Sequence, residues 1–134
     1  MGTRHTYRGE MLQGEQPDWA PLLKTVGERV TGDFMWMFEV ELSNGKRLHA
    51  YKHIDTRCYV HLDHDGAAFV YLESGRYRSF PVIEVLAAVF VPLTGLGGVS
   101  DEQIRASWDA VDRLSLEEPA ADDAGAGGAN RLAE

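Results

Sequence analysis

The sequence predicts an α+β protein in which one helix precedes an antiparallel β-meander of four to five strands and two helices follow it. Between residues 34 and 80, five short runs of β-type residues are separated by the tight-turn pairs Asn44-Gly45, Asp65-Gly66 and Ser74-Gly75. Before and after this region, apolar side chains recur at helical spacing. Helices packed on one side of an antiparallel sheet form the α+β class. If the sheet curls, it becomes an open half-barrel.

The 134-residue chain fits one folded domain between two loose ends. Residues 1–16 are polar with mixed charge, so we expect a flexible N-terminus. Residues 17–114 contain all the periodic segments and form the predicted domain. Residues 115–134 are rich in Ala, Gly and acidic side chains. Such a segment buries too little apolar area to offset its ordering entropy, and we expect a disordered acidic tail.

The composition is typical of a soluble cytoplasmic protein, with 44% hydrophobic and 25% charged residues. The longest apolar run, residues 85–91, is far shorter than the ~20 residues that span a bilayer, so we expect no membrane contact through a spanning helix. Cys58 is the single cysteine and cannot form an internal disulfide, which fits a reducing compartment.

The first helix is predicted over residues 19–30. Asp18 is a suitable N-cap, and Pro21 falls in the first turn, where its missing N–H costs nothing. Gly32 is a natural end for the helix. The apolar stripe consists of Trp19, Leu22, Leu23, Val26 and Val30.

Two further helices are predicted after the sheet. Residues 82–90, which follow Pro81, are apolar on nearly all sides except at Glu84. That pattern is typical of a helix buried in a core or in a subunit interface. The last helix begins at the capping-box pair Ser100 and Gln103. Its apolar face consists of Ile104, Trp108, Val111 and Leu114.

Residues 34–42 form the clearest strand, because every even position from Phe34 to Leu42 is apolar. Asn44-Gly45 follows this strand and predicts a hairpin loop of two residues, since both tolerate the positive φ angles of a type I′ turn. Further strands are predicted over residues 57–63, 67–73 and 76–80. The turn around Asp65-Gly66 fits a tight or a bulged loop, so the sequence leaves the facing of Tyr59, His61, Val60 and Leu62 open.

The two-residue loop determines which side chains of the first hairpin face each other. The opposed pairs are Val40 with His49, Phe38 with Tyr51, and Trp36 with His53. Directly opposed residues share a face. We therefore expect all three residues of the second strand to lie beside Trp36 and Phe38. A loop one residue longer reverses this assignment.

His49, Tyr51 and His53, with His61 and Asp63 on the neighbouring strand, form a candidate ligand or metal cluster. His49 and His53, four positions apart on one strand with Tyr51 between them, point the same way, and successive residues of that face lie roughly 6–7 Å apart between Cα atoms. The metal hypothesis is that the two histidines share a cation. His61 or Asp63 would complete three ligands. In the structural alternative, the imidazoles bond to backbone groups or carboxylates. The sequence identifies no particular metal or cofactor.

The same cluster is compatible with an acid–base enzyme. His49 or His53 would act as the base, Tyr51 as a hydroxyl donor and Asp63 as an orienting carboxylate. No nucleophile and no oxyanion-binding motif accompanies these residues in the sequence. This favours a protein without catalytic activity of its own.

A surplus of large apolar side chains in the first strand favours protein association. Met35, Trp36, Met37 and Phe38 are consecutive, so a large side chain points outward whichever face is buried. We expect Met35, Trp36 and Met37, with Lys52 beside them, to form a contact surface, unless a helix covers that face. The predicted function is a small accessory or regulatory module that acts by association, as a homo-oligomer or with a protein partner.

Single-stranded nucleic-acid binding is less favoured. Tyrosines on the sheet are interleaved with Lys46, Arg47, Lys52, Arg57, Arg76 and Arg78. Cations and stacking aromatics can hold single strands. The formal net charge of −8 and the absence of an RNP-like motif argue against that class.

Overall fold

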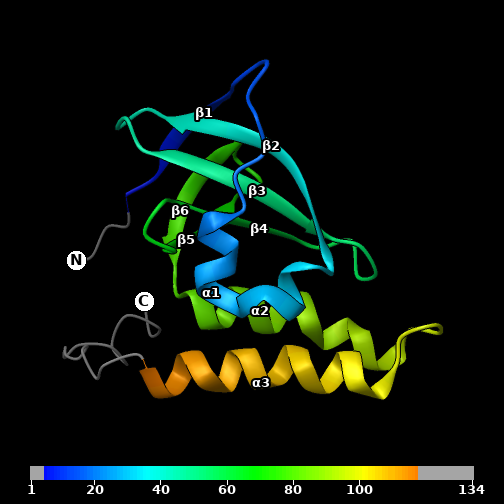
Figure 1. Cartoon of the computed structure of the whole chain (residues 1–134). Coiled ribbons are helices and arrows are strands. Elements are labelled where there is room, and N and C mark those ends of the chain that lie inside the picture. Colours follow the sequence, from blue (N-terminus) through cyan, green and yellow to red (C-terminus); the bar gives the residue numbers. More distant parts are fainter. Residues whose placement is uncertain (1–4, 118–134) are drawn as a thin grey trace.

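The computed structural model describes residues 5–117, which form a closed antiparallel barrel beside three α-helices. The strands are β1 (Tyr7–Met11), β2 (Phe34–Leu42), β3 (Arg47–His53), β4 (Tyr59–Leu62), β5 (Ala68–Tyr71) and β6 (Arg76–Phe80). The helices are α1 (Ala20–Thr31), α2 (Val82–Phe90) and α3 (Asp101–Glu117), and a 3-10 helix over Val91–Gly95 follows α2. In Figure 1 the helices lie together on one side of the barrel, and α3 lies farthest from it. The predicted mixture of helices and antiparallel strands is confirmed.

The predicted four-to-five-strand meander is wrong, because the sheet has six strands and closes into a barrel. The additional strand, β1, lies within the segment 1–16 that was expected to be flexible. β1 pairs with β2 through Gly9 opposite Leu42 and with β6 through Tyr7 opposite Tyr77. Five residues with so few apolar side chains carry too little alternation to predict a strand. The domain therefore begins before residue 17.

The last helix confirms half of the predicted capping box. The Gln103 backbone N–H donates to Ser100 Oγ at 3.1 Å. The Gln103 side chain does not return to the Ser100 backbone, and instead donates to Asp55 Oδ2 at 2.7 Å. This bond ties α3 to the loop between β3 and β4. Helix α3 continues to Glu117, so the predicted tail 115–134 begins inside it, and the rest of that segment lies outside the described residues.

Helix α1 begins one residue later than predicted and contains an unpredicted break. Its N-cap is Trp19 and not Asp18, although Asp18 Oδ1 accepts a hydrogen bond from the Ala20 N–H at 3.0 Å, and Gly32 ends the helix as predicted. Gly27 interrupts it with φ 84° and ψ 168°. Across residues 5–117, we find no helix with the length and apolar character needed to cross a membrane.

The hairpin between β2 and β3 has a loop one residue longer than predicted. The Leu42 N–H donates to the Lys46 carbonyl and the Gly45 N–H donates to the Leu42 carbonyl, both at 2.8 Å. Gly45 has φ 93°, the left-handed conformation of a three-residue loop with a bulge. Val40 consequently pairs with Leu48, and not with His49.

A β-bulge at Met37 shifts the register of the same hairpin a second time. Phe38 pairs with Ala50, whereas Trp36 pairs with Tyr51. One unpaired residue moves the following side chains to the other face. Trp36 therefore lies on the face of Tyr51, as predicted, whereas the prediction that Phe38 shares this face is wrong.

The two faces of the barrel wall contribute to separate hydrophobic cores. The larger core joins the outer face to the helices through Leu22, Val26, Phe34, Tyr51, Val60, Leu62, Leu86 and Phe90, among others. The smaller core lies inside the barrel and contains Val40, Leu42, Leu48, Phe69 and Tyr77. The helices cover one side of the barrel only (Figure 1), so the inner face is filled by the side chains of the barrel itself.

Gly9 allows β1 to close the barrel against Tyr77. A Cβ atom at Gly9 would lie 2.5 Å from Tyr77 Cε1 and 2.8 Å from Val40 Cγ1. Overpacking of this kind costs about 1–3 kcal/mol, so we expect Gly9→Ala to lower the free energy of unfolding by that amount. Denaturant titration measures the change. Gly97→Ala is the control, because a Cβ there meets nothing within 4 Å. Equal losses in the two variants would contradict the packing argument.

Candidate functional site

The structure divides the predicted ligand cluster between the two faces of the barrel wall. His49, Tyr51 and His53 lie on the outer face of β3, toward the helices. His61 pairs with Ala50, so its side chain lies on the inner face. It therefore cannot complete a metal site with the two histidines of β3. Within residues 5–117, no group of three or more His, Cys, Asp or Glu side chains is arranged to hold a metal ion.

Hydrogen bonding assigns His49 a structural role. The Trp36 indole N–H donates to His49 Nδ1 at 2.9 Å, which places the proton of the neutral ring on Nε2. His49 Nε2 faces Asp18 Oδ2 at 3.7 Å and Glu39 Oε2 at 3.8 Å. A protonated nitrogen is not a metal ligand. His49 therefore links the indole of β2 to two carboxylates.

His53 is also bonded to the backbone. Its Nδ1 accepts hydrogen bonds from the N–H groups of Asp55 at 3.1 Å and Thr56 at 3.2 Å. Its Nε2 is buried and has no hydrogen-bond partner among residues 5–117. The rings of Phe34 and Phe90 contact the imidazole edge-on. Burial lowers the pKa of His53, against the smaller opposing effect of nearby carboxylates.

Tyr51 and Asp63, the remaining residues of the predicted cluster, are also hydrogen-bonded within the protein. The Tyr51 hydroxyl donates to the Asp18 carbonyl at 2.6 Å, and burial raises the pKa of this phenol. Asp63 Oδ1 accepts from two backbone N–H groups of the turn between β4 and β5, both at 2.9 Å. Lys46 Nζ lies 3.1 Å from Asp63 Oδ2. Asp63 therefore shapes a turn.

The predicted contact surface of Met35, Trp36, Met37 and Lys52 is also divided between the two faces of the barrel wall. Met35, which is 37% exposed, lies directly opposite Lys52. Trp36 lies on the other face, bonded to His49 and half-buried against the core. Met37 is half-buried in the bulge. Of the four predicted residues, Met35 and Lys52 are thus brought together on one face.

A pocket inside the barrel wall is the strongest candidate site in residues 5–117. It has a volume of about 460 Å³, within the range of small-molecule sites. We call it the barrel pocket, and its lining consists of Gly9, Met11, Phe38, Val40, Tyr59, His61, Tyr71, Gly75 and Tyr77. The pocket opens to solvent beside Met11, Tyr59 and Tyr71, which are all exposed.

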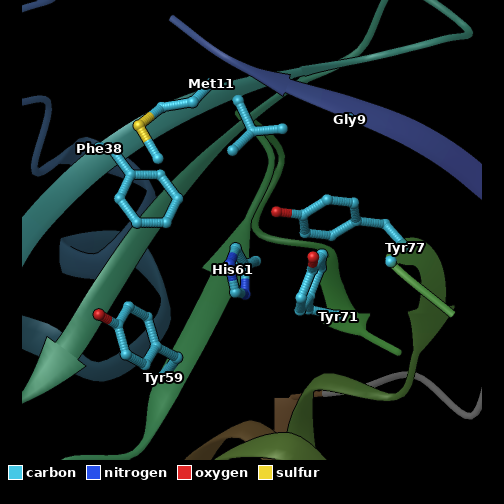
Figure 2. A pocket seen from close by; sticks show the side chains of 9 residues that line it. Gly9, Met11, Phe38, Tyr59, His61, Tyr71 and Tyr77 are labelled. Carbon is cyan, nitrogen blue, oxygen red and sulfur yellow. The ribbon is translucent and has the colours of Figure 1, made fainter. Parts of the chain in front are cut away.

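Aromatic rings surround His61 in the barrel pocket. The Tyr59 ring stacks on the imidazole with centroids 6.0 Å apart and planes at 18°, and the Tyr77 ring meets it edge-on at 5.3 Å. Phe38 lies 6.3 Å from the imidazole, and Tyr71 lies 5.0 Å from Tyr77. Figure 2 shows His61 in the middle of this group, with the hydroxyl groups of Tyr71 and Tyr77 on one side of it.

The pocket keeps His61 uncharged at neutral pH. The residue is 6% exposed, and burial lowers its pKa to about 4. Burial is the cause of this shift, and no carboxylate lines the pocket to oppose it. A neutral imidazole donates one hydrogen bond and accepts another. Burial also raises the pKa of Tyr77, and the nearby Tyr71 adds to the effect. The barrel pocket is thus an apolar cavity with a few polar groups.

Sequence reasoning included His61 but missed its surroundings. Gly9 and Met11 belong to the segment that was expected to be flexible, and Phe38 was placed on the other face. The three tyrosines come from three different strands, so only closure of the barrel brings them together. Comparisons of the chain with protein-family models, with curated proteins and with solved structures give no match.

Proposed function

We propose that the protein is a small accessory module that binds a ligand in the barrel pocket. The ligand is an apolar or aromatic molecule with a hydrogen-bonding group that reaches His61. The observation that carries this proposal is the buried, uncharged imidazole inside a pocket of aromatic rings.

The rings supply contact area for an apolar body. Aromatic side chains bury large surfaces and favour offset or edge-to-face contacts with a second ring. Phe38, Tyr59, Tyr71 and Tyr77 present such surfaces around one cavity. Of these, Tyr59 and Tyr71 are 39% and 58% exposed, so a ligand would remove apolar surface from water.

His61 supplies the polar contact. The ring nitrogens of His61 are not among the fully buried unpaired atoms of residues 5–117, but burial of the imidazole still carries a desolvation cost that an apolar ring of similar size would not. No hydrogen bond or charge opposes the effect of burial on the pKa of His61. Residues that lower the stability of the fold at positions where an apolar residue would fit are typical of functional sites. A ligand hydroxyl or carbonyl would form a hydrogen bond with the imidazole.

Naphthalene and naphthol test this proposal, because they differ by one hydroxyl group. We expect both to bind to the wild-type protein, with naphthol up to about tenfold tighter because of one hydrogen bond to His61. His61→Phe should remove that preference while preserving the apolar cavity wall. Fluorescence titration of the naphthyl group measures both affinities.

His64→Phe is the matched control, because His64 is exposed and does not line the pocket. It should leave both affinities unchanged. The absence of saturable binding of either compound to the wild-type protein would overturn the proposal. An unchanged naphthol preference in His61→Phe would show that His61 is not the polar contact.

Self-association is a second proposal, supported by a different observation. Met35 and Ile54 are exposed apolar side chains at the same end of the β2–β3 ladder, where Phe34 pairs with His53 and Met35 with Lys52. A groove of about 420 Å³ between α2 and the barrel adds apolar surface through Val70, Phe80 and Val85. Sedimentation at high protein concentration should reveal dimers or larger species. A monomer at every concentration would contradict this second proposal.

A further inference from the structure

Lys52 lies beside the barrel pocket on the same face of the wall. It is directly opposite Tyr59, a lining residue, in the pairing of β3 with β4. Its Nζ lies 5.7 Å from the centroid of the Tyr59 ring. On its other side, Lys52 is opposite the exposed Met35 of β2. Lys52, half-buried as a residue, thus stands between the exposed side chains of Met35 and Tyr59, next to the opening.

The charge of Lys52 is not neutralised by the described part of the chain. Arg29, Lys46 and Arg47 each lie within 4 Å of a carboxylate, whereas no carboxylate of residues 5–117 forms an ion pair with Lys52. The lining of the barrel pocket contains no acidic residue either. Lys52 therefore offers a positive charge without an ion-pair partner in residues 5–117 beside the opening, in a chain with a formal net charge of −8.

We propose that the ligand of the barrel pocket is an amphipathic anion: an apolar or aromatic body that enters the pocket and a carboxylate that remains at the opening beside Lys52. The inference rests on the proposed ligand binding and adds the charge of the ligand. Burial inside the pocket disfavours charged groups, as the lowered pKa of His61 indicates. The anionic group of the ligand therefore stays at the partly solvated opening. An ammonium group there attracts a carboxylate and leaves the apolar body its contacts with the rings.

Naphthoate, compared with naphthalene, tests the inference on the full chain, because neither compound carries a hydroxyl group for His61. We expect the wild-type protein to bind naphthoate more tightly than naphthalene. Lys52→Gln should lower the ratio of naphthoate to naphthalene affinity by about two- to fivefold, the effect of one partly exposed ion pair. Lys52→Arg should preserve the ratio, and added salt should reduce it in the wild-type protein and in Lys52→Arg but not in Lys52→Gln.

Lys24→Gln is the matched control, because Lys24 is exposed on α1 and lies near Gly66, in the turn between β4 and β5. This variant should leave the ratio unchanged. If naphthol binds but naphthoate has no advantage over naphthalene that Lys52→Gln removes, the inference is wrong while the proposed function stands. If none of the naphthyl compounds binds to the wild-type protein, the proposed function itself fails.

Discussion

Phe90→Ala is expected to lower the free energy of unfolding by about 3–5 kcal/mol. Phe90 is fully buried at the end of α2. Its ring meets Phe34 of β2 at 6.3 Å, His53 of β3 at 5.9 Å and Trp108 of α3 at 6.1 Å. Removing it leaves a cavity where the barrel wall and two helices meet. Denaturant unfolding, followed by circular dichroism, measures the loss.

Val91→Ala is the control for this substitution. Val91 follows Phe90 directly and is 61% exposed, so its truncation should change stability by no more than about 0.5 kcal/mol. A loss below about 1 kcal/mol for Phe90→Ala would contradict the central position of the ring. It would indicate that the helices and the barrel do not share one core.

Acidification is expected to destabilise the wild-type protein by about 3 kcal/mol through His61. Burial lowers the pKa of His61 from 6.5 to about 4. Between these pH values the unfolded chain binds a proton at this position and the folded protein does not. Stability therefore falls as the pH decreases from 6.5 towards 4. Unfolding free energies at neutral pH and near pH 4 measure the effect.

His61→Phe isolates this effect from other titrating groups. The pKa of His53 is also lowered by burial and contributes in the same direction, but it is present in both proteins. The variant should lose about 3 kcal/mol less stability than the wild-type protein over the same interval. Equal losses in the two proteins would mean that His61 is protonated in the folded state over this interval, which would contradict a neutral His61 in the barrel pocket.

Several elements could be predicted from local patterns. The strand predicted over residues 34–42 coincides with β2, and that over residues 76–80 with β6. The helix predicted over residues 82–90 coincides with α2, and Ser100 caps α3 as expected. Alternation, helical spacing and caps involve neighbours in the chain, so the residues themselves carry the information.

The candidate site could not be predicted in the same way. Hydrogen bonds to Trp36 and to the backbone occupy ring nitrogens of His49 and His53, which the sequence predicted as metal ligands. His61 faces the barrel pocket because of how β4 pairs with β3. A one-residue change in any of these ladders would have exchanged the faces.

The sequence by itself determined the extent and type of most helices and strands and the mixed helix–sheet class. Only the tertiary structure decided that β1 closes the sheet, that a three-residue loop and a bulge at Met37 set the β2–β3 register, and that tyrosines from three strands surround His61. The physical reason is how far apart in the chain the interacting residues are. Periodicity and capping depend on residues a few positions apart, whereas closure and register depend on packing between residues as distant as Gly9 and Tyr77.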